Sequence, residues 1–113
     1  MKLIKKTDKI FIAGHKGLVG SEVLNIFREK KYKNIVTVNR KKIDLTNQKK
    51  VGNFFKKYKP KAVIICAAKV GGIKANNTYR GEFIYENLMI QNNIIHASYK
   101  NNVKSLIFLG SSC

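Results

Sequence analysis

Three glycines near the amino terminus have the spacing of a loop that binds phosphates. The segment reads Gly14-His15-Lys16-Gly17-Leu18-Val19-Gly20, a G-x-x-G-x-x-G pattern. The first glycine permits a tight turn, the second lets the backbone approach a pyrophosphate, and the third lets helix and strand pack closely. The amino end of the following helix then offers free N–H groups to the phosphates. The alternative is a plain structural turn. A strand before the loop, a helix after it and a second strand about 20 residues on favour a dinucleotide site.

The residues after the second strand indicate which dinucleotide is preferred. Sites for NAD place an acidic residue there to hold the ribose 2′-hydroxyl. This sequence has Asn39-Arg40-Lys41-Lys42 instead, and Arg40 can hold a 2′-phosphate through two hydrogen bonds, with Lys16 or Lys41 assisting. We therefore expect NADP(H), unless Arg40 only belongs to the lysine-rich surface. Asp44, next to Leu45, can bind the adenine amino group or merely cap a turn.

Alternating apolar segments predict the elements that position these loops. The expected strands are Lys9–Ala13, Ile35–Val38, Ala62–Cys66 and Ser105–Leu109. Helices are expected around Val19–Phe27, Val51–Tyr58 with Thr46 as N-cap, and Phe83–Tyr99. The buried side of the last helix is expected to consist of Ile84, Leu88, Ile90, Ile94, Ile95 and Ala97.

This order of elements predicts an α/β fold, a Rossmann-like doubly wound parallel sheet with strand order 3-2-1-4. Ligands of such sheets bind beyond the carboxyl ends of the strands, here expected between strands 1 and 4. The loops that matter are Gly14–Gly20, Asn39–Leu45, Ala67–Gly81 and Gly110–Cys113.

Composition excludes several classes of protein. The 113 residues allow one domain, and no apolar run is long enough to cross a membrane. The formal charge is +17, but lysines outnumber arginines 20 to 3 and are spread along the chain, so a solvated surface is favoured over nucleic-acid binding. The two cysteines form no metal or disulfide pattern. We expect a soluble, cytoplasmic protein without a metal site.

Several segments together resemble the GDP-L-fucose synthases, extended short-chain dehydrogenase/reductases of the NAD-dependent epimerase/dehydratase class. They are the glycine loop with Ser21, Ala67-Ala68-Lys69-Val70-Gly71-Gly72-Ile73, Ala75-Asn76-Asn77-Thr78-Tyr79, Asn93-Ile94-Ile95-His96-Ala97 and Phe108-Leu109-Gly110-Ser111-Ser112-Cys113. The resemblance runs along nearly the whole chain but covers only the amino-terminal part of a family member. Arg80 stands where the family usually has proline.

The resemblance implies a reaction and roles for individual residues. The family epimerises C3 and C5 of GDP-4-keto-6-deoxy-D-mannose and then reduces C4 with NADPH, giving GDP-L-fucose. It implies cofactor contacts by the glycine loop and by Ala67, Ala68, Leu109, Gly110, Ser111 and Ser112, the last four bordering the nicotinamide. It also implies that Ser111 hydrogen-bonds the C4 carbonyl and that Cys113 is the acid/base of the epimerisations. The alternative for Ser111 and Ser112 is capping of a helix or turn after the last strand, and the alternative for Cys113 is an arbitrary chain end.

Part of the family's machinery is not in the sequence. No tyrosine is followed four residues later by lysine, and His15 and His96 match no catalytic position. We therefore expect residues 1–113 to be a partial NADP(H)-binding domain without the substrate domain, inactive when alone, from a family whose full-length members form homodimers. A non-catalytic NADP(H)-binding module and another nucleotide-sugar epimerase or dehydratase are the alternatives. The open edge of the last strand predicts dimerisation, aggregation or marginal stability.

Overall fold

The computed structural model describes residues 4–38, 42–66 and 80–109, with only the helical backbone for residues 80–84. Its sheet consists of β1 (Ile10–Ala13), β2 (Ile35–Val36), β3 (Ala62–Ile65) and β4 (Ser105–Phe108). The helices are α1 (Leu18–Glu29), α2 (Gln48–Tyr58) and α4 (Arg80–Lys100). All strand pairs are parallel, so the predicted doubly wound α/β fold is confirmed.

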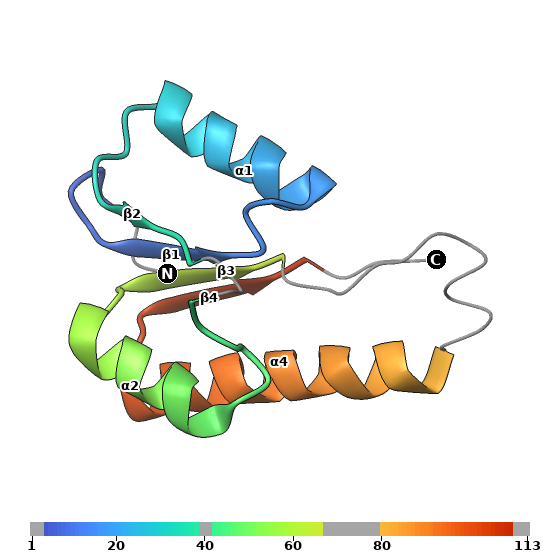
Figure 1. The fold of residues 1–113 in the computed structure, drawn as a ribbon. Coiled ribbons are helices and arrows are strands. Elements are labelled where there is room, and N and C mark those ends of the chain that lie inside the picture. The colour runs from blue at the N-terminus through green and yellow to red at the C-terminus, as the bar shows by residue number, and fades with distance from the viewer. Residues whose placement is uncertain (1–3, 39–41, 67–79, 110–113) are drawn as a thin grey trace.

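The strand order is β2-β1-β3-β4, which corrects the predicted 3-2-1-4. The third strand does not lie outside β2: the chain crosses back over β1, and β3 pairs with the other side of β1. The reason is that α1 covers one face of the sheet and α2 the other (Figure 1). Right-handed crossovers on opposite faces move the chain in opposite directions from β1. The switch point therefore lies between β1 and β3 and not between the first and last strands.

Two apolar cores hold these layers together. On one face Phe11 of β1 packs edge-on against Phe55 and tilted against Phe54 of α2, with ring centroids 5.7 and 4.7 Å apart. The same core takes in Ile90 and Ile94 of α4. On the other face the buried side chains of Ile10, Ile12, Leu24, Ala62 and Ile64 form the second core beneath α1. Burial on both faces explains why β1 and β3 are uninterrupted apolar runs.

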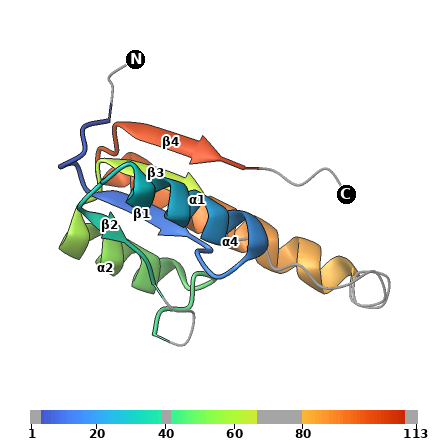
Figure 2. The same cartoon turned by 90° about the horizontal axis from the view of Figure 1, so that it is seen from above.

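The outer strand β4 is less well covered. Figure 2 shows β4 at the edge of the sheet, outside the part that α1 covers. Its side chains Leu106, Ile107 and Phe108 are 41%, 44% and 46% exposed. The prediction of an open apolar edge is confirmed for these residues, whereas the association expected from it stays a prediction.

Two sequence predictions about the helices are wrong in part. Leu88 and Ile95 of α4 are exposed and not buried, because they lie on the side of the helix that is turned away from the core residues Ile90 and Ile94. The N-cap of α2 is Asn47, whose side chain accepts a hydrogen bond from the Lys50 N–H at 3.0 Å. Thr46, the predicted cap, instead binds Asp44.

Within the described residues, no helix is both long enough and apolar enough to cross a bilayer.

Candidate functional site

The glycine loop leaves β1 and enters α1, as its sequence predicts. Gly14 follows the strand directly and has a φ of 88°, a conformation that residues with a side chain rarely adopt. The Gly17 N–H donates to the Gly14 carbonyl at 3.1 Å, which closes the turn. The Ser21 N–H donates to the Gly17 carbonyl at 2.8 Å, so the hydrogen bonding continues from the turn into the helix. The loop is therefore a tight, internally bonded turn at the carboxyl end of the central strand β1.

Gly17 and Gly20 differ in how strictly the fold requires a glycine. A Cβ on Gly20 would overlap the carbonyl oxygen of Gly14 and lie 2.7 Å from its carbon, so no side chain fits there. A Cβ on Gly17 would lie 3.5 Å from the same oxygen, an ordinary contact. Packing of helix against strand thus requires glycine at position 20. The fold itself does not require glycine at position 17, so close approach of a ligand to the backbone is the reason that remains for a glycine there.

The amino end of α1 is open to an anion. Gly17 is its N-cap and supplies no side-chain hydrogen bond, and no acidic residue lies in the first turn. Leu18 and Val19, at the start of the helix, are 85% and 55% exposed. The first N–H groups of a helix carry partial positive charge and need acceptors. A diphosphate of a dinucleotide supplies such acceptors.

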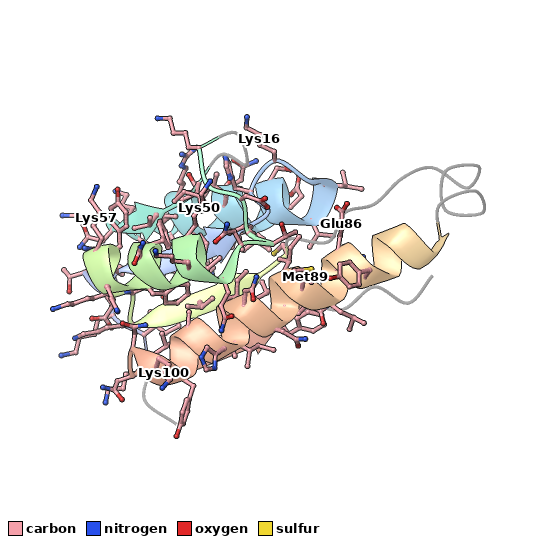
Figure 3. All side chains as sticks on the ribbon, turned by 60° about the horizontal axis from the view of Figure 1, so that its bottom comes forward. Lys16, Lys50, Lys57, Glu86, Met89 and Lys100 are labelled. Carbon is pink, nitrogen blue, oxygen red and sulfur yellow. The ribbon has the colours of Figure 1, made fainter. Side chains whose placement is uncertain are left out.

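The charges beside the loop are positive. Burial, followed by the nearby cations Lys16 and Arg28, lowers the pKa of His15 below its ordinary value of 6.5. Lys16 is exposed and its side chain projects from the loop (Figure 3). A bound phosphate group would offset this positive field, so the electrostatics of the loop favour an anionic ligand.

A second part of the site follows β2. Asp44 caps a turn there: its Oδ1 accepts hydrogen bonds from the Thr46 N–H at 2.9 Å and the Thr46 hydroxyl at 2.6 Å. The Asn47 N–H donates to the Asp44 carbonyl at 3.0 Å. Of the two roles that the sequence left open for Asp44, turn capping is confirmed, and contact with adenine stays a prediction.

This turn forms one wall of an open pocket of about 420 Å³. The lining residues are Asp44, Thr46, Tyr85, Glu86 and Met89. Figure 3 shows Glu86 and Met89 close together on α4. The mixture of an apolar thioether, an aromatic ring and carboxylates suits a flat heterocycle with exocyclic amino groups, such as adenine.

The far wall of this pocket is the part that sequence reasoning missed. Tyr85, Glu86 and Met89 come from α4, far from the glycine loop in sequence. Asn93, one turn further on, donates from its side-chain Nδ2 to the carbonyl of Leu45 at 3.0 Å and so ties α4 to the turn. Leu45 itself is 4% exposed and belongs to the core. Glu86, Met89 and Asn93 are three and four residues apart, so they lie on one face of a helix. This spacing was the signal available in the sequence.

The carboxyl ends of three strands meet beside the glycine loop. The Cys66 N–H donates to the Ala13 carbonyl at 2.8 Å, which joins the ends of β3 and β1 just before Gly14. The Leu109 N–H donates to the Ile65 carbonyl at 3.1 Å and carries the pairing past the end of β4. Burial raises the pKa of the Cys66 thiol, so this cysteine is not activated as a nucleophile.

Several predicted site residues lie outside the described residues. They are Arg40, Ala67, Ala68, Gly110, Ser111, Ser112 and Cys113. Their roles stay predictions. In the part of the chain that the structure describes, no three metal-ligating side chains come together.

Comparison with known proteins gives the class. Residues 10–113 match the NAD dependent epimerase/dehydratase family, and the chain belongs to this family. The chain is 53% identical over 108 residues to GDP-L-fucose synthase 1 of Arabidopsis thaliana, covering 96% of this chain and 33% of that protein.

Two solved structures from Campylobacter jejuni are also similar. A GDP-mannoheptose C4 reductase with NADP bound is 46% identical, with a TM-score of 0.89, and the match covers 95% of this chain and 34% of that one. A GDP-D-glycero-L-gluco-heptose synthase in the presence of NADPH is 45% identical, with a TM-score of 0.92, and the match covers 97% and 32%. This chain therefore spans about a third of the length of the relatives it matches.

Proposed function

We propose that residues 1–113 are part of the NADP(H)-binding domain of a GDP-sugar epimerase/reductase, with GDP-L-fucose synthesis as the reaction. The observation that carries the proposal is the glycine loop: Gly14 turns, Gly20 packs, and Gly17 leaves the uncapped start of α1 open to a diphosphate. High identity to a GDP-L-fucose synthase supports the choice of reaction.

The ligand would extend from this loop across the carboxyl edge of the sheet. The diphosphate would lie against the start of α1, and adenine would lie in the pocket between the Asp44 turn and α4. When bound, NADPH supplies the hydride for ketone reduction. The neighbouring reductase solved with NADP bound supports NADP(H) as the cofactor. Arg40 is proposed to recognise the 2′-phosphate.

Ser111 and Cys113 are proposed as the catalytic residues of this part of the enzyme. A serine hydroxyl can polarise the C4 ketone, and a thiol can exchange protons at C3 and C5. Both follow Leu109, whose N–H is held against β3 at the edge where the strands end. The proposal also includes a cytoplasmic location, consistent with the free Cys66 thiol.

The reaction is best tested in a chimera. Residues 1–113 would replace the matching segment of the Arabidopsis relative, and NADPH oxidation would be measured with GDP-4-keto-6-deoxy-D-mannose. We expect turnover, with Ser111→Ala slowing reduction and Cys113→Ser slowing epimerisation, each by at least about tenfold. A folded chimera that binds NADPH without turnover would favour a non-catalytic module.

A second candidate is reduction of a different GDP-sugar. The two heptose enzymes are 45–46% identical to this chain, not far below the fucose synthase, so the cofactor part alone does not separate these substrates. To test this, residues 1–113 would be joined to the carboxy-terminal segment of a fucose synthase in one chimera and of a heptose enzyme in another. Equal cofactor binding by both chimeras, with turnover only of the sugar matched to that segment, would show that specificity lies outside residues 1–113.

Cofactor preference is tested with Arg40→Asp and Lys42→Asp as a charge-matched control. If Arg40 binds the 2′-phosphate, Arg40→Asp weakens NADPH binding by at least about tenfold and NADH binding much less. Lys42→Asp makes the same change of charge two residues away and should affect both cofactors only slightly. Equal losses for NADPH and NADH in Arg40→Asp would show that Arg40 does not read the phosphate.

A further inference from the structure

The lysines that are spread along the sequence gather at one edge of the folded chain. All four strands begin at the end of the molecule where α1, α2 and α4 finish (Figure 1). Four short segments form this amino edge, namely residues 4–9, 28–34, 56–61 and 100–104. Together they contain 13 of the 23 lysines and arginines but only two acidic residues, Asp8 and Glu29. About two thirds of the formal charge of +17 is therefore held at this one edge.

Five of these lysines form a row across the starts of the strands. Lys9, Lys61 and Lys104 each stand one residue before a strand, and the register of β1, β3 and β4 places them in line. The Lys61 N–H donates to the Lys9 carbonyl at 2.8 Å, and the Lys104 N–H donates to the Lys61 carbonyl at 2.9 Å. Lys33 extends the line to β2, because its N–H donates to the Lys6 carbonyl at 3.0 Å. We call these five residues the lysine row.

The row has a regular spacing along the edge. The main chains of neighbouring strands lie about 4.8 Å apart, so each step of this length brings a further lysine. Four of the five side chains are exposed, and that of Lys9 is half-buried. Figure 3 shows Lys57 and Lys100, which belong to the same four segments, at this end of the molecule. The amino edge is therefore a line of ammonium groups that an extended anion can follow.

The fold offsets little of this charge by itself. The Asp8 carboxylate is already engaged: its Oδ1 lies 3.5 Å from the Lys61 Nζ, and its Oδ2 accepts the Lys5 N–H at 2.9 Å. The carboxyl ends of three helices lie here too, and each carries about half a negative charge. With Asp8 and Glu29 they offset about 3.5 of the 13 positive charges. Because like charges side by side on a sheet repel, an anion bound along the row would stabilise the fold.

The residue types of the edge disfavour a nucleic acid as this anion. Proteins that bind single-stranded nucleic acids stack the bases on aromatic rings. The two tyrosines within the four segments are already engaged. Tyr32 packs edge-on against Phe27 with ring centroids 4.8 Å apart, and the ammonium groups of Lys9 and Lys57 lie 5.8 and 5.2 Å from the centre of the Tyr58 ring. The edge thus provides contacts for charge and none from these segments for bases.

Spacing disfavours an acidic peptide. An extended peptide presents side chains to one face only about every 6.8 Å, which is wider than the steps of the lysine row. A chain of condensed phosphates carries a negative charge on every unit and has no bases. Lysine ammonium groups bind phosphate as point charges, without the paired geometry of arginine. We propose that the lysine row binds a linear polyphosphate.

This site is separate from the glycine loop. Lys9 precedes β1 and Gly14 follows it, so five residues of extended chain, about 16 Å, lie between the two positions. The row and the loop therefore lie at opposite edges of the sheet. Polyphosphate and a dinucleotide should bind at the same time.

Paired variants test the row. Fluorescence anisotropy of a short linear polyphosphate, labelled at one end, would measure the affinity of the folded chain. Lys33→Gln with Lys104→Gln removes the two ends of the row and leaves the pair of Asp8 and Lys61 intact. The control, Lys49→Gln with Lys50→Gln, makes the same change of net charge at exposed positions of α2 outside the four segments.

We expect the row variant to weaken binding by at least about tenfold at physiological salt and the control by less than about threefold. Circular dichroism verifies that both variants are folded. Equal losses in the two variants, or no binding by the folded parent chain, would overturn the proposal.

Salt dependence gives a second measure of the same contacts. For a single-stranded polyanion, the logarithm of the binding constant falls with the logarithm of the salt concentration by about 0.7 for each charge neutralised. Loss of two lysines should therefore reduce this slope by about 1.4 in the row variant and leave it nearly unchanged in the control. An unchanged slope in the row variant would contradict the proposal.

Competition identifies the ligand and its place. Saturating NADPH should leave the polyphosphate bound, and its displacement would place the polyphosphate at the glycine loop and overturn the proposal. Oligothymidylate, polyglutamate and phosphatidylserine vesicles, compared at equal total charge, should each compete at least about threefold less well than unlabelled polyphosphate. Stronger competition by any of these three would assign the row to a nucleic acid, an acidic protein or a membrane instead.

Discussion

The amino ends of α1 and α2 differ in whether a side chain caps them. The start of α2 is closed by its own sequence, since the Asn47 side chain accepts the Lys50 N–H at 3.0 Å. The start of α1 has Gly17 at the same position and no side-chain cap. A cap at this position typically stabilises a helix by about 1 kcal/mol. Glycine at this position forgoes only a few tenths of a kcal/mol relative to asparagine. It leaves the first N–H groups of α1 without a side-chain acceptor, which is what the proposed binding of a diphosphate requires.

The largest effect is expected from Gly20→Ala. The new Cβ would overlap the Gly14 carbonyl, so α1 must move away from β1. We expect a loss of about 3 kcal/mol or more in the free energy of unfolding, which a domain of this size barely tolerates. Urea denaturation followed by circular dichroism measures it. Gly52→Ala on α2, where nothing lies within 4 Å of the added Cβ, is the control and should be neutral or stabilising.

Gly17→Ala should separate binding from folding. Its Cβ meets only an ordinary contact at 3.5 Å, so the free energy of unfolding should change by less than about 1 kcal/mol. The same methyl group lies where a diphosphate would approach, so NADPH affinity should fall at least about tenfold. Fluorescence titration with NADPH measures this. Unchanged affinity would mean that the ligand does not lie over this turn.

Asn47→Ala is the converse of Gly17→Ala. It removes the cap of α2, so we expect a loss of about 1 kcal/mol in the free energy of unfolding. NADPH affinity should stay the same once the fraction of folded chain is taken into account. Asn47→Asp keeps an acceptor at the cap and should restore the stability. A loss of affinity in folded Asn47→Ala would erase the distinction between the two helix starts.

The smallest effect concerns the charge of His15. Burial and the cations Lys16 and Arg28 lower its pKa from 6.5, so protonation is less favourable in the folded chain than in the unfolded one. Its contribution to stability is therefore present above about pH 6.5 and declines as the pH falls. A bound diphosphate should raise this pKa. NMR titration with and without NADPH measures the change. A His15 pKa unaltered by NADPH would place the phosphates elsewhere.

Local patterns predicted more of this molecule than its long-range pairings. The loop from Gly14 to Gly20 lies where its spacing indicates, because turn, strand and helix depend on neighbouring residues. The position of β3 next to β1 was mispredicted, because an apolar run indicates burial on both faces but not which strand lies beside it. Burial of Leu88 and Ile95 was mispredicted for a similar reason: helical periodicity does not say which of two apolar faces packs on the sheet. The pocket wall from Tyr85 to Met89 depends on the same tertiary packing.

The claim that the open start of α1 binds the diphosphate of NADP(H) is tested most directly by calorimetric titration of the folded chain with NADPH and, in parallel, with NADH. The account predicts saturable heat with one NADPH per chain and weaker binding of NADH. A folded chain that gives no heat beyond the heat of dilution with either cofactor would contradict it.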